Sequence, residues 1–157
     1  DGLSREVDLI LDGGATQLGL ESTVIGFDAD MPVLLRFGAI ARSAIEAVVG
    51  PLAAADDAIR SPGQLESHYA PRAALRLNAR EKEPSEILLG FGSSPGAELH
   101  LSPDGDLKEA ASNLFAMLHE LDRQGPRIAV APIPETGLGE AINDRLRRAA
   151  APRTDHA

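Results

Sequence analysis

The stretch Ser61-Pro62-Gly63-Gln64-Leu65-Glu66-Ser67-His68-Tyr69-Ala70-Pro71 separates two differently patterned halves of the chain and so divides the fold in two. Pro62-Gly63 is a turn signal, and Pro71 restricts the residue before it to extended conformations. No apolar periodicity joins them, which argues against both helix and strand. The stretch nevertheless holds a histidine beside the only tyrosine of the chain. A passive spacer is typically built from Gly, Ser and charged residues, so we interpret this one as a linker with a function.

Composition narrows the class of protein. The chain has 157 residues, of which 43% are hydrophobic, enough for a buried core. Fifteen basic against twenty-four acidic residues give a net charge of −9, which makes direct nucleic-acid binding an unfavourable interpretation. There is no cysteine, a pattern that suits the cytoplasm, and no apolar run approaches the roughly 20 residues of a membrane span, so we expect no direct membrane binding.

The first half predicts a few strands and one helix. Residues 7–12 indicate a buried strand that ends at Gly13-Gly14, and residues 22–27 and 32–36 indicate a hairpin around a turn at 28–30. A helix follows, with apolar residues recurring at helical spacing until Gly50-Pro51 stops it; they are Ile45, Val48, Val49 and Leu52. These elements are too few to close a core. We therefore expect residues 1–50 to be the end of a larger α+β domain whose beginning lies upstream, and residues 51–74 to be the linker.

The second half alternates strand and helix. We expect strands at 74–77, 87–91, 99–101 and 128–131 and helices at 107–121 and 141–149. The longer helix has an apolar stripe, a capping box formed by Asp106 and Glu109, and a stop at Gly125-Pro126. In the second helix Arg145, Arg147 and Arg148 lie near its negative C-terminal end. The alternation predicts a small α/β, Rossmann-like layered domain over residues 75–151 with a mostly parallel sheet, followed by a frayed tail at 152–157.

Gly137-Leu138-Gly139 lies between a predicted strand and a predicted helix. Two interpretations stay open: a tight turn before the helix, or backbone N–H groups that hold a phosphate or carboxylate. The dinucleotide fingerprint requires a further glycine where this chain has Ile142. His119-Glu120 is no zinc helix either, because the second histidine is replaced by Arg123. We expect no metal ligands from protein side chains.

A more informative set comprises Glu21-Ser22-Thr23, Arg36 and His68-Tyr69. An arginine can bind phosphate oxygens, Ser and Thr hydroxyls can orient a carboxylate, and a tyrosine can stack on a nucleotide. Together they suit a nucleotide and a small acid. Each also has an ordinary structural interpretation: a surface ion pair for Arg36, strand positions for Ser22 and Thr23, and an aromatic residue packing the linker for Tyr69.

Three segments of the chain resemble, in order, the end of the YrdC-type domain of threonylcarbamoyl-AMP synthases. They are Asp8-Leu9-Ile10-Leu11-Asp12-Gly13-Gly14, Gly19-Leu20-Glu21-Ser22-Thr23-Val24-Ile25 and Pro32-Val33-Leu34-Leu35-Arg36-Phe37-Gly38-Ala39-Ile40. Ser61-Pro62-Gly63 and His68-Tyr69-Ala70-Pro71 are similar to the linker of the long, two-domain members. The run from Ala131-Pro132-Ile133-Pro134 to Asn143-Asp144-Arg145-Leu146 is similar to their small C-terminal domain. The resemblance spans almost the whole chain.

The resemblance implies activation of a small amino acid by ATP. Threonine and bicarbonate form a carbamate that attacks the α-phosphate, which releases pyrophosphate and leaves threonylcarbamoyl-AMP for the modification of tRNA. Ser22 matches a residue that contacts threonine, and Arg36 and Tyr69 match residues that contact ATP; Thr23, His68, Gly137 and Gly139 are weaker candidates. ATP, with magnesium, is a substrate, no prosthetic group is implied, and the tRNA threonylcarbamoyl transferase machinery is an implied partner.

The chain also departs from the family. The family's Arg-Pro-Gly is Arg36-Phe37-Gly38 here, the middle of the linker lacks the basic and aromatic residues of many relatives, and the Lys-x-Arg and Ser-x-Asn motifs of the N-terminal half have no counterpart. We therefore expect the 157 residues to be inactive alone. An alternative function is a non-catalytic module that gates the synthase cleft or recruits a partner.

Overall fold

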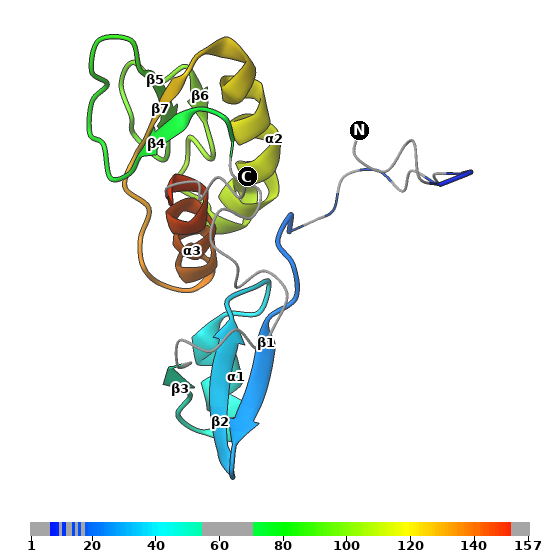
Figure 1. The fold of residues 1–157 in the computed structure, drawn as a ribbon. Helices are drawn as coiled ribbons and strands as arrows, with labels where there is room; N and C mark the ends of the chain where they lie inside the picture. The colour runs from blue at the N-terminus through cyan, green and yellow to red at the C-terminus, as the bar shows by residue number, and fades with distance from the viewer. Residues whose placement is uncertain are drawn as a thin grey trace.

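The structure is a computed structural model that describes residues 7–9, 11, 14, 16, 18–54 and 71–151. Two sheets lie in separate parts of it (Figure 1). In chain order the helices and strands are β1 (Val24–Asp28), β2 (Met31–Arg36), α1 (Arg42–Val49), β3 (Ala53–Ala54), β4 (Ala74–Arg76), β5 (Ile87–Gly90), β6 (Leu99–His100), α2 (Leu107–Gln124), β7 (Arg127–Val130) and α3 (Leu138–Ala150).

The first sheet has the strand order β1-β2-β3. β1 and β2 form the predicted antiparallel hairpin, which turns at Ala29-Asp30, and α1 ends at Gly50 as the stop signal predicts. β3 pairs in parallel with β2 and was not predicted, because two alanines carry no strand pattern. It lies within the range 51–74 that we assigned to the linker, and so does the first residue of β4.

The prediction of a buried strand at residues 7–12 is wrong for the residues of that range that the structure describes. Val7, Leu9 and Leu11 belong to no strand, and Leu9 and Leu11 are 75% and 87% exposed. A strand is stable only when a neighbour binds its backbone N–H and C=O groups. The apolar pattern of residues 7–12 indicates a segment that could form a strand, but a strand also requires a neighbouring strand to pair with. Of the apolar stripe predicted for α1, only Leu52, beyond the end of the helix, is buried; no residue of α1 itself is buried, and Val48 is 84% exposed.

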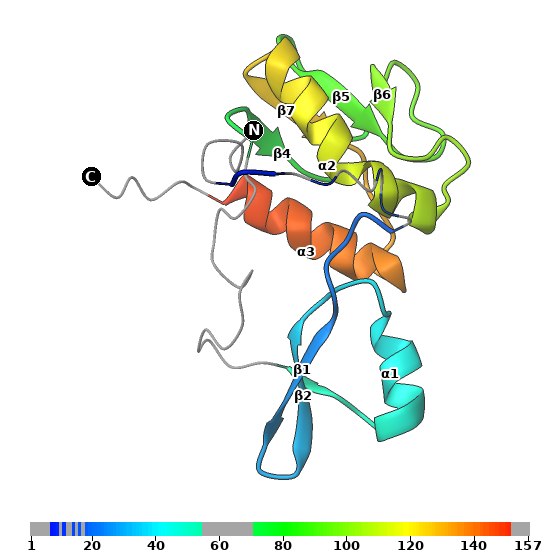
Figure 2. The ribbon, with the colours of Figure 1, turned by 90° about the vertical axis from the view of Figure 1, so that its right-hand side faces the viewer.

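The second sheet is parallel throughout, in the order β4-β7-β5-β6. This confirms the predicted α/β architecture. Helices α2 and α3 share one core cluster with the sheet, and α3 lies on the side that faces the first sheet (Figures 1 and 2). The fully buried members of this core are Leu89, Leu101, Ala110, Ala111, Leu114, Leu121, Ile128 and Ile142. A smaller cluster is formed by Ala79, Leu88 and Ala129. Leu88 and Ala129 alternate with core residues along their strands and therefore lie on the other face of the sheet.

Helix α2 begins with a modified capping box. The Asp106 side chain accepts hydrogen bonds from the backbone N–H groups of Lys108 and Glu109, at 2.6 and 3.0 Å, as an N-cap should. The reciprocal bond differs from the prediction. The Asp106 N–H donates to Ser102 Oγ, which donates in turn to the Glu109 carboxylate. Ser102 is fully buried, so the relay satisfies a hydroxyl group inside the core.

No helix within the described ranges is long and apolar enough to span a membrane.

The Arg76–Glu86 pair makes stability depend on pH. Hydrogen bonds from Arg76 and from the Glu83 N–H lower the pKa of Glu86 from 4.5 to about 2, and its side chain is only 1% exposed. A carboxyl group with a depressed folded-state pKa contributes stability that is present above its unfolded-state pKa and is lost as the pH falls. The wild-type protein should lose stability through Glu86 as the pH falls from 4.5 to about 2. We expect Glu86→Gln, which cannot titrate at this position, to lose less stability than the wild type over the same pH range.

Thermal unfolding at a series of pH values checks this expectation. Asp104→Asn, at an exposed turn, is the control and should keep the wild-type profile. If the Glu86→Gln profile coincides with that of the wild type across this window, the assigned role of the pair is wrong.

Candidate functional site

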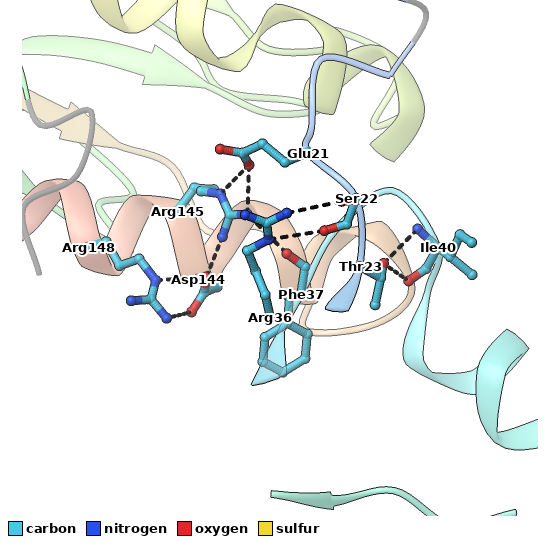
Figure 3. A network of polar contacts seen from close by, with 9 residues as sticks. All are labelled: Glu21, Ser22, Thr23, Arg36, Phe37, Ile40, Asp144, Arg145 and Arg148. Atoms are coloured by element: carbon cyan, nitrogen blue, oxygen red, sulfur yellow. Dashed lines mark hydrogen bonds and ion pairs between the residues drawn. The ribbon is translucent and has the colours of Figure 1, made fainter. Parts of the chain in front are cut away.

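Ser22 and Arg36, which are 14 residues apart in sequence, lie together at one end of the hairpin. Ser22 is exposed and precedes β1, whereas Arg36 is half-buried and ends β2. The Arg36 Nε donates to the Ser22 carbonyl oxygen at 3.1 Å, and its Nη2 donates to Ser22 Oγ at 3.0 Å (Figure 3). The structure therefore brings the two strongest sequence candidates in its described part into direct contact.

Thr23 holds a neighbouring loop in place. Its hydroxyl group donates to the Ile40 carbonyl oxygen at 2.7 Å and accepts from the Ile40 N–H at 3.0 Å. The Ala39 N–H donates to the Glu21 carbonyl oxygen at 2.9 Å. We call residues 21–23 and 37–40 the paired loops. The hydroxyl of Thr23 both donates and accepts within them, which favours its structural interpretation over ligand binding.

The paired loops approach so closely that only glycine fits at position 38. A Cβ atom there would lie 2.3 Å from the Thr23 nitrogen and 2.4 Å from both the Glu21 oxygen and the Ser22 carbonyl carbon. All three are backbone atoms, so no side-chain rotation could relieve the contact. Gly38 therefore sets the distance between the segment that carries Ser22 and the segment that follows Arg36.

Arg145 of α3 binds both paired loops. Its Nε and Nη2 donate to Glu21 Oε2 at 2.9 and 2.7 Å, and Nη2 also donates to the Phe37 carbonyl oxygen at 3.0 Å (Figure 3). The third nitrogen, Nη1, donates to Asp144 Oδ2 at 2.6 Å. The side chain is only 5% exposed. Arg145 thus contacts the residue immediately before Ser22 and the residue immediately after Arg36.

The arginine side chains at this contact are paired with the carboxylates of Glu21 and Asp144. Asp144 also accepts from Arg148, with Nε–Oδ2 and Nη2–Oδ1 distances of 3.0 and 3.2 Å. Partial burial acts to raise the pKa of Glu21, but the hydrogen bond and the charge of Arg145, with a contribution from Arg36, hold it below its ordinary value. Glu21 is therefore a carboxylate at neutral pH and a charge-assisted acceptor for Arg145.

A second contact joins the same two parts of the chain. The Arg42 Nε lies 3.4 Å from Glu140 Oε1 on the first turn of α3, and the Arg42 guanidinium lies 5.3 Å from the centre of the Phe37 ring. Phe37, where the resembling family has proline, thus offers its ring to Arg42 and its carbonyl oxygen to Arg145. Arg42 and Arg145 therefore both contact Phe37, which belongs to the paired loops.

Gly137 and Gly139 form the turn at the start of α3. Gly137 has a φ of 57°, a backbone conformation that favours glycine, and a Cβ atom at position 139 would lie 1.8 Å from the Pro134 oxygen. The Gly139 N–H donates to the Thr136 carbonyl oxygen at 2.9 Å and is used within the turn. This geometry accounts for both glycines without a ligand.

The remaining candidates lie elsewhere. His68 and Tyr69 fall outside the described residues, as does the linker from 55 to 70 and the tail from 152. Within the described ranges, no three His, Asp or Glu side chains gather as they would around a metal ion. A small cavity at the ends of β4 and β7 has both polar and apolar walls; its lining residues are Leu77, Asn78, Val130, Ala131, Glu135, Asn143, Leu146 and Arg147.

The sequence interpretation missed Arg145 as part of the site. It explained this arginine, like Arg147 and Arg148, by the helix dipole. A signal was present, because Arg145 lies four residues after Ala141 and four before Ala149, both buried. Positions four apart share one helix face. An arginine on the buried face of a helix needs an acceptor, and Glu21 supplies it.

Comparison with known proteins gives consistent matches. The family described as "Threonylcarbamoyl-AMP synthase, C-terminal domain" matches residues 40–151. Threonylcarbamoyl-AMP synthase of Pyrococcus abyssi is 34% identical over 173 residues, which covers 94% of this chain and 51% of that protein. The synthase of Bacillus subtilis is 33% identical, covering 92% of this chain and 49% of that protein. The chain spans about half the length of the curated relatives it matches.

Solved structures of a threonylcarbamoyl-AMP synthase relative also match this chain. The crystal structure of P. abyssi Sua5 complexed with L-threonine matches with a TM-score of 0.80 and 30% identity, over 94% of this chain and 51% of that one. A variant of the same protein, in which an adjacent His-Tyr pair is replaced by alanines, matches with a TM-score of 0.74, 31% identity and coverages of 88% and 47%. The chain therefore belongs to the threonylcarbamoyl-AMP synthase family, and most of it matches that family's C-terminal domain.

Proposed function

We propose that the chain is the C-terminal half of an enzyme that converts ATP, L-threonine and bicarbonate to threonylcarbamoyl-AMP and pyrophosphate for the modification of tRNA. The observation that carries the proposal is the direct contact between Ser22 and Arg36. A residue expected to bind threonine and a residue expected to bind ATP are held together, as a reaction between the two substrates requires. The cytoplasmic location expected from the sequence belongs to the same proposal.

The chemistry expected of these residues is mainly positioning. The Ser22 hydroxyl orients the threonine carboxylate, and the Arg36 guanidinium offers N–H donors and positive charge to the ATP phosphates. Magnesium enters with ATP, bound mainly to phosphate oxygens and water, as this ion usually is. Tyr69, with His68 beside it in sequence, is a nucleotide contact in this proposal, and exclusion of water there would protect the mixed anhydride; both residues lie outside the described ranges.

Steady-state kinetics test the two roles in the full reading frame that encodes the chain, with pyrophosphate release as the assay. Ser22→Ala is expected to raise the KM for threonine about tenfold, and Arg36→Gln to raise the KM for ATP about tenfold or more, because a charged hydrogen bond is lost. Ser43→Ala and Arg123→Gln, at exposed positions, are the matched controls. The proposal fails if the wild-type protein releases no pyrophosphate above blank.

The 157 residues alone are expected to lack this activity, because they correspond to about half of each relative. The same assay on the isolated chain should give the blank rate. Pyrophosphate release well above blank, dependent on all three substrates, would overturn this part of the proposal.

A second candidate function is a non-catalytic module that gates the cleft or binds a partner such as the transferase machinery. The contact of α3 with the paired loops favours it, because α3 belongs to the small domain. Calorimetry with MgATP and a pull-down with the transferase separate the two functions for the isolated chain. Partner capture without nucleotide binding supports the module, and nucleotide binding without partner capture counts against it.

A further inference from the structure

The paired loops contain Ser22 and directly follow Arg36, yet the side chain that joins them from outside belongs to the small domain. Arg145 donates to Glu21, which precedes Ser22, and to the carbonyl oxygen of Phe37, which follows Arg36. One guanidinium group therefore spans the two chain segments on which the ligands lie (Figure 3).

The contact has the properties of a rigid support. Arg145 is 5% exposed, and each of its three guanidinium nitrogens donates to an oxygen within 3.0 Å. Asp144, which receives one of these bonds, is held in turn by Arg148. Because the planar guanidinium has fixed donor directions, the positions of its acceptors are constrained relative to α3.

We propose that Arg145 is a positioning residue for the synthase reaction, through which the small domain sets the geometry of Ser22 and Arg36. The inference rests on the proposed function and deepens it. The small domain then shapes the substrate site through Arg145, which contacts Glu21 and Phe37 of the paired loops. The binding of threonine and the binding of ATP depend together on one side chain of α3.

Arg145→Met keeps an unbranched side chain and removes all donors, and Arg145→Lys keeps the charge but not the fork. Arg147→Met is the matched control: it lies on the same helix, and its side chain, paired with Glu135 at 2.8 Å, is 53% exposed. Amide hydrogen exchange is measured on the isolated chain. Ala39 and Ile40 donate across the paired loops, whereas Leu101 and Ala131 donate within the second sheet.

We expect Arg145→Met to accelerate exchange at Ala39 and Ile40 about tenfold or more, as the loss of a charged hydrogen bond implies. Exchange at Leu101 and Ala131 should not change, and Arg147→Met should leave all four at wild-type rates. Equal acceleration at all four amides in Arg145→Met would show a general loss of stability and would overturn the inference. Unchanged exchange at Ala39 and Ile40 would overturn it too.

Kinetics in the full reading frame provide a second readout. Arg145→Met should raise the KM values for threonine and for ATP together, whereas Ser22→Ala should raise mainly the KM for threonine. In Arg145→Lys both KM values should lie between those of Arg145→Met and the wild type. Arg147→Met should have wild-type KM values. If the wild-type protein is active and Arg145→Met keeps both KM values, the positioning role fails. If the wild-type protein is inactive, the proposed function fails, and the exchange experiment alone decides whether Arg145 positions the paired loops.

Discussion

Gly38→Ala is expected to separate the paired loops and disrupt the Ser22–Arg36 contact. The added methyl group would lie 2.3–2.4 Å from three backbone atoms of residues 21–23, well inside van der Waals contact. Backbone must therefore move, and overpacking of this kind typically costs about 1–3 kcal/mol. The bonds from the Ala39 N–H to Glu21 and between Thr23 and Ile40 should weaken at the same time.

Amide exchange of Ala39 and Ile40 measures the local effect, and the KM for threonine in the full reading frame measures its consequence. Gly26→Ala is the matched control in the same hairpin. There the nearest atom to the new Cβ is the end of the Leu35 side chain, at 2.8 Å, which can rotate away. We expect Gly26→Ala to change stability by less than about 1 kcal/mol. Wild-type exchange and wild-type KM in Gly38→Ala would contradict the steric argument.

Leu114→Ala is expected to have the largest effect on global stability. Leu114 lies in the middle of α2, is fully buried and belongs to the core shared by both helices and the sheet. Truncating a buried leucine removes apolar contact and leaves a cavity, at a cost of about 2–5 kcal/mol. Such a loss is a large fraction of the stability of an ordinary domain.

Urea unfolding measures the difference in free energy between wild type and variant. Leu11→Ala makes the same chemical change at a side chain that is 87% exposed, and should cost less than about 0.5 kcal/mol. A large loss in Leu11→Ala would indicate that residues 7–12 are buried after all, as their apolar pattern predicts. A small loss in Leu114→Ala would show that the core can close around the deletion.

Sequence patterns predicted those parts of the fold that depend on local rules. The apolar stripe of α2 and its Gly125 stop predicted a helix because helix geometry repeats within the segment itself. Elements that depend on a distant partner were harder. β3 has only two alanines and exists because β2 lies beside it. Val7, Leu9 and Leu11 are exposed, and no described strand pairs with them.

The same division applies to the site. Ser22 and Arg36 were predicted as ligands because the family motifs that contain them are each contiguous in sequence, and the structure brings the two residues together. Arg145 was assigned to the helix dipole because its partner is 124 residues away. Helix periodicity places Arg145 on the buried face, but only the folded chain shows which carboxylate accepts its hydrogen bonds.

This long separation orders the events of biosynthesis. A ribosome adds about 5–20 residues per second, so roughly 6–25 seconds pass between the appearance of Glu21 and that of Arg145. During that interval the hairpin exists without the side chain that joins its two loops from outside. The nascent chain can complete the surroundings of Ser22 and Arg36 only after α3 has been made.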